Sequence, residues 1–559
     1  MTLKQQRTNS RWSSCVAVIA IGTVLSLGIS VFPAGGSALP ALQDPAALTA
    51  NLSTPFLGCD PVGGSVSPAS AQALSLVLPS AFITNPDGTV VQAPSFLAQA
   101  EVQSLSPLKI IYSILPNARW ISGAPLGLRD FITTWKWGRN GFGPDANLYR
   151  QIRSITRGPS LHQIVVTFST STNNWQALFS PLLPSSFGLS GAGSCAYPTS
   201  NIDLSAGPYV IASSTPTTIV LIKNPHWWGS DAPFPSIELL GNTTSPDSLF
   251  GTTSNVGLDD TPGFSPSGTL AITSIASVSS KSDLSNLLLS LDFDSSRRHG
   301  LSKPLRLAVS EYVNRQQLIQ ATVGRVVSTV VPASSHLYSQ GQISTSMNSP
   351  APAWTRESQR QRQLLASKSL SALGMHKSNG FWVRKNGTML SLSLGVPAND
   401  PWAVDVASVV KDQLISQGIT VRLVGLATSS AVASAIEHSQ VSGGFVSRPS
   451  SAFLSEAMAW FDSQSLAVTS AYWSGFNSPA INKLAHKASQ QMNPQNAAPL
   501  YQSIDTSLWT SLPSLPLLTE VQTIAWSSAI QGVTTNPFPP GVLGGLLTWD
   551  VTAVNPSSV

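Results

Sequence analysis

The amino-acid sequence predicts an α/β protein with at least two lobes. A strand at residues 390–395, a helix at 401–417 closed by Gly418, and a strand at 419–424 follow one another, which is the order of a βαβ unit with parallel strands. The chain has 559 residues, more than one compact domain usually holds. Hydrophobic residues make up 42% of the chain and charged residues 10%, so we expect a folded protein with a polar but weakly charged surface.

The other elements are expected to alternate along the chain. In the first half, short apolar runs between turn-forming residues predict strands, together with one short amphipathic helix. The expected strands are 108–115, 164–168, 209–211 and 218–223, and the helix is 129–138. In the second half, apolar residues at helical spacing predict helices at 303–323, 359–373, 478–490 and 497–509, followed by a strand at 515–518.

The N-terminus has the pattern of an export signal. Lys4, Arg7 and Arg11 precede an uncharged apolar stretch at 16–32, and small residues follow up to Ala38. This order predicts a secretory signal that is cleaved after Ala38. The alternative is an uncleaved anchor, because an apolar stretch of this length is at the lower limit for crossing a bilayer. We therefore expect an extracytoplasmic protein, secreted, periplasmic or at the cell surface, or one anchored to the membrane by this segment.

The net charge excludes one class of partner. The whole chain carries +5, but without residues 1–38 it has 28 basic and 26 acidic residues. Such a balance is too even for nucleic acid or an anionic membrane to be the main partner, and no basic run has interleaved aromatic residues. We expect no nucleic-acid binding and a monomer.

The cysteine count predicts one disulfide. Cys15 lies in or before the signal, which leaves Cys59 and Cys195 as an even pair in an oxidising compartment. The alternative is two free thiols, since sequence spacing alone does not determine whether two cysteines can be bridged.

The search for catalytic or metal-binding motifs is negative. None of the seven histidines stands at metal-ligand spacing from another His, Cys or carboxylate on one helix, and no phosphate loop or nucleophile elbow is present. The neighbouring acids Asp259 with Asp260, and Asp292 with Asp294, are expected in solvated loops. We therefore expect no enzyme, no metal and no cofactor. The fifteen tryptophans suit a cleft that holds a ligand by apolar contact, although core packing is the commoner role of any single one.

Short motifs in a fixed order carry a family resemblance. The most specific are GPY at 207–209 and KNPHWWG at 223–229. The others are PSFLAQAEV at 94–102, RWISGAPL at 119–126, DFITTW at 130–135, LRLAVSEYVNR at 305–315, QLISQGITV at 413–421 and FNSPAINKL at 476–484. In this order they resemble the family 5 extracellular solute-binding proteins of ABC importers, the peptide- and nickel-binding group.

This resemblance implies a periplasmic-binding-protein-like fold of type II, in which hinge strands join two lobes and lobe I carries an inserted subdomain. Transfer by matching segments gives a signal peptide at 1–38, lobe I at 39–70, 190–290 and 521–559, the inserted subdomain at 71–189, and lobe II at 291–520. The ligand would lie between lobes that close around it.

One segment departs from the family pattern. Peptide binders of the family commonly place an acidic residue near the segment that corresponds to 443–450, and GGFVSRPS contains none. Arg448 could instead hold an anionic group, with an ion pair at the surface or hinge as the alternative. The expected pocket residues are Phe445, Ser447, Arg448 and Trp473.

The sequence therefore predicts a receptor that captures a peptide or similar small solute and presents it to an ABC permease. The first alternative is a scaffold or regulator of the cell envelope that kept this fold without transport, which the missing acidic anchor favours. An exported hydrolase is the second alternative, and convergent carboxylates or a Ser/His pair in the structure would support it.

Overall fold

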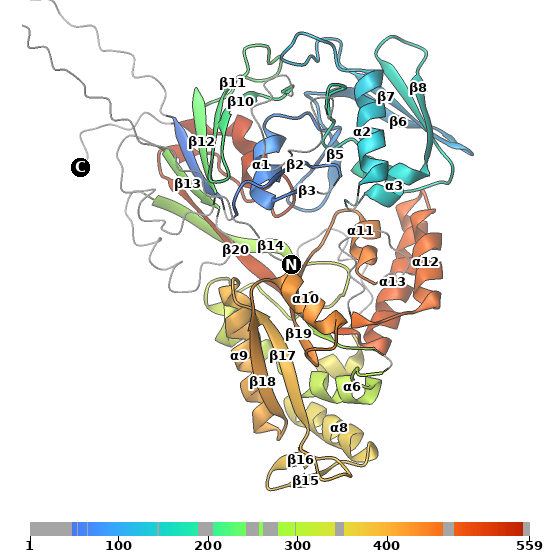
Figure 1. The fold of residues 1–559 in the computed structure, drawn as a ribbon, viewed down its shortest axis with the longest axis vertical. Coiled ribbons are helices and arrows are strands. Elements are labelled where there is room, and N and C mark those ends of the chain that lie inside the picture. Colours follow the sequence, from blue (N-terminus) through green and yellow to red (C-terminus); the bar gives the residue numbers. More distant parts are fainter. Residues whose placement is uncertain are drawn as a thin grey trace, which may run out of the picture. The chain divides into compact units, whose positions relative to one another are not determined.

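In the computed structural model a single ten-stranded sheet runs through both lobes of the protein (Figure 1). The structure describes residues 47–52, 54–63, 65–141, 143, 145–187, 205–241, 256–260, 278–296, 298–340, 351–461 and 474–551. Residues Pro45–Val559 form one compact unit. The predicted signal peptide lies outside the described residues.

The strands of this sheet come from distant parts of the chain. Side by side they are β10 (Tyr209–Ser214), β11 (Thr218–Lys223), β12 (Ser236–Gly241), β1 (Leu48–Leu52), β13 (Val256–Asp260), β20 (Ser514–Ser527), β14 (Val278–Phe293), β19 (Gly443–Pro449), β17 (Ser391–Pro397) and β18 (Thr420–Leu426). Strand β1 is parallel to β12 and β13, and β17 is parallel to β18 and β19. Each lobe therefore contributes three neighbouring parallel strands, and in lobe I the antiparallel strands β11 and β10 extend the sheet beyond β12.

Strands β14 and β20 connect these two groups of strands. They pair antiparallel from Val278 opposite Ser527 to Asp292 opposite Ser514, and their register shifts between Leu284 and Leu288. One end of β20 also pairs with β13, and the opposite end of this ribbon pairs with β19 through β14. We call β14 and β20 the hinge strands, because the ladder between the lobes is interrupted only within them.

Lobe I is built around the first hydrophobic core, which takes its residues from 48–239 and 524–549. Its inserted part is a four-stranded antiparallel sheet, packed against α2 (Leu128–Asn140) and α3 (Ala146–Gln151), with strand order β6 (Leu97–Leu105), β7 (Leu108–Ile114), β9 (Gln163–Phe168) and β8 (Ile152–Arg157). Three rings meet in its core: Phe131 lies with its ring centroid 5.3 Å from that of Tyr112 and 4.6 Å from that of Phe179. Shorter elements of lobe I are α1 (Pro68–Ser75), β2 (Gly58–Asp60), β3 (Ser65–Val66), β4 (Phe82–Thr84), β5 (Val90–Gln92), β21 (Ile530–Gln531), β22 (Asp550–Val551) and the 3-10 turns Trp175–Ala177 and Val542–Thr548.

Lobe II is built around the second core, with residues from 289–445 and 509–521, and two smaller clusters. Its helices are α6 (Lys303–Tyr312), α7 (Arg315–Ala321), α8 (Gln359–Ala372), α9 (Pro401–Ser416), α10 (Ser429–Glu437), α11 (Leu454–Ala459), α12 (Pro479–Ser489) and α13 (Pro494–Ser511). A hairpin of β15 (His376–Ser378) and β16 (Phe381–Val383) and the 3-10 turns Val323–Arg325 and Ala353–Arg356 complete it.

Local signals explain where several helices begin. A capping side chain followed by proline at the first helical position satisfies one free backbone N–H and presets the backbone. Three helices of lobe II start in this way, α9 at Asp400-Pro401, α12 at Ser478-Pro479 and α13 at Asn493-Pro494.

The structure confirms the predicted βαβ unit and corrects two predicted elements. The expected helix at 303–323 is broken, because Val313 is extended and the Asn314 side chain caps a new helix by accepting from the Gln317 backbone N–H. The expected strand at 515–518 is only part of β20. In the described part of the chain, no helix has the length and apolar character that a membrane crossing requires.

Candidate functional site

A pocket of about 150 Å³ lies where the hinge strands meet lobe II and lobe I. Four segments far apart in the sequence line it, namely the β4–β5 turn, the hinge strand β14, a loop of lobe II and the C-terminal return. The lining residues are Pro86, Asp283, Leu284, Ser285, Ser339, Gln340, Thr535, Pro537 and Phe538. The pocket is therefore bounded by lobe I, a hinge strand and lobe II together.

Asp283 provides the charged group of this pocket. Its carboxylate lies 3.0 Å from Lys281 Nζ and accepts a hydrogen bond of 3.1 Å from the Thr535 hydroxyl. Burial acts to raise the pKa of Asp283, but the hydrogen bonds from Lys281, the Leu284 backbone N–H and Thr535, together with the positive charge of Lys281, outweigh it and hold the pKa below its usual value. The Asp283 side chain is 43% exposed, so this carboxylate is ionised, fixed in position and accessible.

The lobe II wall of the pocket is held by hydrogen bonds. The Gln340 backbone N–H donates to Thr519 Oγ1 over 2.8 Å, and the Gln340 side chain donates to the Thr329 carbonyl over 2.7 Å. The Ser450 hydroxyl donates to Ser339 Oγ over 2.7 Å. This loop is thus tied to both the hinge strand β20 and the end of β19, and its polar groups are held in place before a ligand arrives.

A second polar cluster lies at the carboxyl ends of the parallel strands of lobe II, the usual position of ligands in open α/β sheets. The Ser447 hydroxyl donates to Glu520 and lies 3.5 Å from Asp400 Oδ2. Burial and the neighbouring Asp400 raise the pKa of Glu520 to about 8, and burial also raises the pKa of Asp400. Glu520, next to the carboxyl group of Asp400, therefore keeps its proton to a higher pH than an exposed glutamate does.

Arg448 faces the opposite side of β19 and is 4% exposed. Its Nη1 lies 3.3 Å from Asp292 Oδ2, its Nη2 donates to Ser514 Oγ over 3.2 Å, and its guanidinium lies 5.0 Å from the Phe461 ring centroid. Arg448 therefore forms an ion pair with Asp292 on a hinge strand, and its guanidinium is not exposed to a ligand in this structure. Asp292, expected in a solvated loop, is instead buried on β14.

The expected pocket residues are thus only partly brought together. Phe445 is fully buried in the core of lobe II, whereas Ser447 and Arg448 hold the two buried polar clusters on either face of β19. Trp473 lies outside the described residues. Cys59, on β2, is disulfide-bonded, but Cys195 also lies outside the described residues, so its pairing with Cys59 stays a prediction.

Two contacts join the inserted subdomain to lobe II. The Asn173 backbone N–H donates to the Ser489 carbonyl over 2.8 Å, and the Asn173 side chain donates to the Ala488 carbonyl over 3.2 Å. The carboxyl groups of Asp145 and Glu456 also lie within hydrogen-bonding reach of each other, and burial together with this contact raises the pKa of Asp145. These contacts tie the inserted subdomain to α11 and α12 of lobe II.

One buried histidine, His336, lies next to a buried acid, as the histidine of a catalytic triad would. His336 Nδ1 lies 3.3 Å from Asp505 Oδ1, but its Nε2 lies 3.1 Å from the Ser514 backbone carbonyl oxygen, not from the hydroxyl. A carbonyl oxygen is no nucleophile for this imidazole to activate, so these three residues do not form a catalytic triad. Within the described residues, no group of three His, Cys, Asp or Glu side chains could hold a metal ion.

Residues 95–495 match the family model "Bacterial extracellular solute-binding proteins, family 5 Middle". The oligopeptide-binding protein OppA of Mycobacterium tuberculosis is 25% identical over 480 residues, which are 82% of this chain and 77% of that protein. The structure of the periplasmic EDTA-binding protein EppA superposes with a TM-score of 0.77 at 19% identity, over 91% of this chain and 98% of that one. The structure of the oligopeptide-binding protein AppA of Bacillus subtilis, in complex with a nonapeptide, superposes with a TM-score of 0.71 at 14% identity, over 91% of this chain and 99% of that one. These structures confirm the predicted two-lobed fold.

Proposed function

Because this chain belongs to the bacterial extracellular solute-binding proteins of family 5, we propose that it captures a peptide or similar small solute outside the cytoplasm and presents it to an ABC permease. Its role is substrate binding, and we propose no chemical reaction for it. The single observation that supports capture between the lobes is the pocket at the hinge, whose walls come from lobe I, the hinge strand β14 and lobe II.

We propose that Asp283 binds an amino group of the solute. It is an accessible carboxylate at a pocket that lacks any competing acid among its lining residues, and a charged hydrogen bond to an ammonium group is among the stronger polar contacts. Lys281, 3.0 Å away, would bind a carboxylate of the same solute. The acid that the family places near 443–450 would thus be replaced by one on the hinge strand.

The size of the pocket limits what it holds when the lobes are closed. The pocket volume of about 150 Å³ is close to the volume of a cavity that accepts a benzene-sized molecule. It would therefore enclose one end of a peptide or a single small solute, and longer ligands would extend from it between the lobes. The names of OppA and of the AppA complex, which refer to oligopeptides, support peptides as the first solutes to test.

Closure would use the interrupted ladder of the hinge strands. Between Leu284 and Leu288 the register of β14 against β20 shifts, so a rotation there breaks fewer backbone hydrogen bonds than elsewhere. Ser447 and Arg448 act in this proposal as positioning residues, because their contacts with Glu520 and Asp292 tie β19 to the hinge strands. A bound solute stabilises the closed form because it binds that form more tightly than the open form.

Native mass spectrometry of the chain from residue 39 onward, purified from its own host, tests capture directly, together with a thermal-shift screen of peptides and small solutes. We expect a co-purifying small molecule, or a solute that raises Tm by linkage. The substitution Asp283→Asn should weaken the binding of that solute by about tenfold or more. Asp231→Asn is the matched control, because it also removes the acid of a Lys–Asp pair, at 3.2 Å from Lys223 on the surface.

The outcomes separate the proposal from its site. An empty protein that no solute stabilises would contradict solute capture and favour a scaffold. A solute that binds Asp283→Asn and Asp231→Asn equally well would keep solute capture and overturn the assignment of Asp283.

A further inference from the structure

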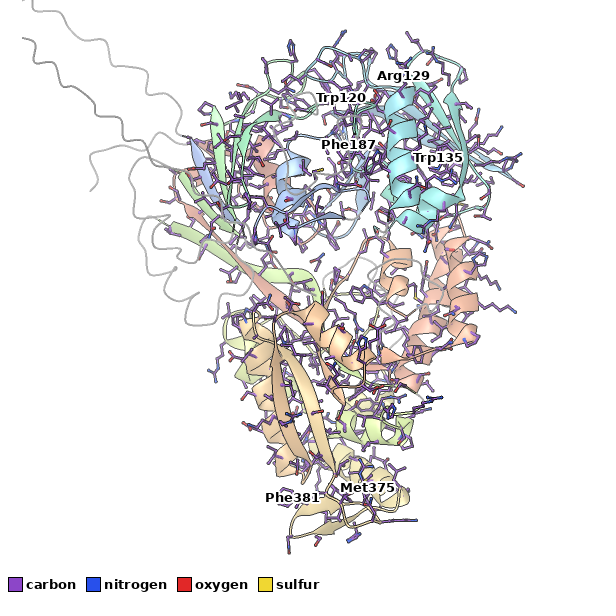
Figure 2. All side chains as sticks on the ribbon, viewed as in Figure 1. Trp120, Arg129, Trp135, Phe187, Met375 and Phe381 are labelled. Atoms are coloured by element: carbon purple, nitrogen blue, oxygen red, sulfur yellow. The ribbon has the colours of Figure 1, made fainter. Side chains whose placement is uncertain are left out.

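The β15–β16 hairpin of lobe II uses only one of its faces to pack. Trp382 on β16 is buried in the core of lobe II, and its backbone N–H donates to the Gly418 carbonyl over 2.8 Å. In Figure 1 the hairpin lies beyond α8 and the ends of β17 and β18, and Figure 2 labels Phe381 on it. The hairpin is therefore anchored to lobe II by the face that carries Trp382.

The second face is hollow and partly apolar. An open depression of about 420 Å³ is lined by Phe381, Val383 and Met389, with His376 and Lys385 also on its wall. Phe381 is 38% exposed and Met389 60% exposed. Large apolar side chains that remain exposed next to one another mark a surface that is covered by something else.

The charge around this hairpin is one-sided. Residues 358–399 contain six basic residues and no acid, whereas the whole chain has 31 basic and 26 acidic residues. Arg362 is buried and donates to the Val313 carbonyl. The remaining five make no ion pair within the described residues, and they are Arg360, Lys368, Lys377, Arg384 and Lys385.

We propose that this face of the hairpin docks on an anionic phospholipid surface, with Phe381 and Met389 in the interface and with Lys385, which lines the depression, and its neighbour Arg384 among the headgroups. Lys377 lies on the opposite face, over the Trp382 ring. Long basic side chains bury their carbon stems and reach anionic headgroups with their charged ends, and apolar side chains beside them insert. A protein partner would need about 800 Å² of well-packed surface on this side. A short hairpin with mobile basic side chains matches a fluid array of headgroups better than fixed acids on a partner.

This site is separate from solute capture. None of the residues that line the depression lines the pocket at the hinge. Docking would hold lobe II near the membrane while lobe I moves, without occupying the ligand pocket. The evenly balanced charge of the chain as a whole hides this local basic surface.

Vesicle co-sedimentation of the chain from residue 39 onward tests the proposal, with phosphatidylcholine vesicles that contain or lack phosphatidylglycerol. We expect binding to be about tenfold or more tighter when phosphatidylglycerol is present, and to fall as salt is raised. Phe381→Ser combined with Met389→Ser should reduce partitioning about tenfold. Arg384→Glu combined with Lys385→Glu should abolish the preference for the anionic lipid.

Matched controls keep the result specific. Leu161→Ser removes an exposed apolar side chain of lobe I, and Lys483→Glu with Lys487→Glu makes the same charge change on α12; we expect both to bind like the wild type. Equal binding to both vesicle types, or an equal loss in the α12 control, would overturn the proposal. Concentration-dependent self-association that the hairpin variants abolish would also overturn it, since the occupant would then be a second copy of the chain.

Discussion

Replacement of Glu520 by glutamine is expected to stabilise the protein at slightly alkaline pH. Glu520 is 7% exposed, and burial together with Asp400 raises its pKa from 4.5 to about 8. At about 1.4 kcal/mol per pH unit this difference corresponds to roughly 5 kcal/mol. Glutamine retains an oxygen that can accept the hydrogen bond from Ser447, but it does not titrate.

The sign follows from proton binding. Between pH 4.5 and about pH 8 the folded protein keeps a proton on Glu520 that the unfolded chain releases, so the free energy of unfolding falls as pH rises through this window. Below the window the Glu520→Gln variant and the wild type should be equally stable. Above it the variant should be more stable by up to roughly 5 kcal/mol.

Urea unfolding of both proteins at about pH 5 and about pH 8 measures this difference. The matched control is Glu437→Gln, an exposed glutamate on α10, which should leave the pH dependence of the wild type unchanged. If Glu520→Gln and the wild type lose the same free energy of unfolding between the two pH values, Glu520 is not held protonated in the fold and the reasoning is refuted.

Three further changes test other contacts. Arg448→Ala should cost about 3–5 kcal/mol of unfolding free energy by removing the guanidinium that pairs with the buried Asp292 carboxylate, which keeps its hydrogen bond from Ser290, whereas Arg448→Met combined with Asp292→Leu should recover most of that loss in the same urea titration. Asn173→Ala removes one hydrogen bond to lobe II and should weaken solute binding about fivefold by calorimetry, by destabilising closure; unchanged affinity would contradict the contact. Because the pKa of Asp145 is raised by burial and by Glu456, the wild type should become more compact in small-angle X-ray scattering as the pH is lowered, and Asp145→Asn should be compact throughout; a pH-independent wild type would argue against this pair.

The α/β unit of lobe II could be predicted from sequence because its periodicity is uninterrupted. Residues 390–424 alternate a buried strand, an amphipathic helix and a second strand, and Gly418 closes the helix with φ +88°, a conformation that favours glycine. Each element has one constant environment along its length, so its apolar pattern has a single period. Such segments are the ones that sequence patterns describe best.

The hinge strands could not be predicted in this way. Along β14 the first residues are partly exposed and polar, and only those from Leu288 to Phe293 are buried without interruption. A strand that passes from one lobe to the other changes its surroundings midway, and therefore shows no constant alternation. The predicted strand at 515–518 covers the most apolar part of β20, where it crosses the core of lobe II.

The polar groups of the site were missed for a related reason. Asp283, Gln340 and Thr535 belong to ordinary residue types and stand in no local motif, and Thr535 reaches Asp283 across 252 positions of sequence. Ser447 and Arg448 were predicted from a family segment, and the side chains that pair with them, Glu520 and Asp292, come from the hinge strands. Only the folded chain shows that none of these four residues lines the pocket at the hinge.

The course of β20 through both lobes has a consequence for how the protein folds. Strand β13 of lobe I pairs with β1 on one side, but it gains its second neighbour only when β20, which ends at Ser527, is present. The sheet of lobe I therefore joins strands that are far apart in the sequence, and this pairing must wait for residues made long after β13. Contacts over such long separations form slowly. Until β20 is in place, the edge of β13 stays unpaired on that side. Deletion of β20 should therefore impair lobe I, although most residues of lobe I precede it in the sequence.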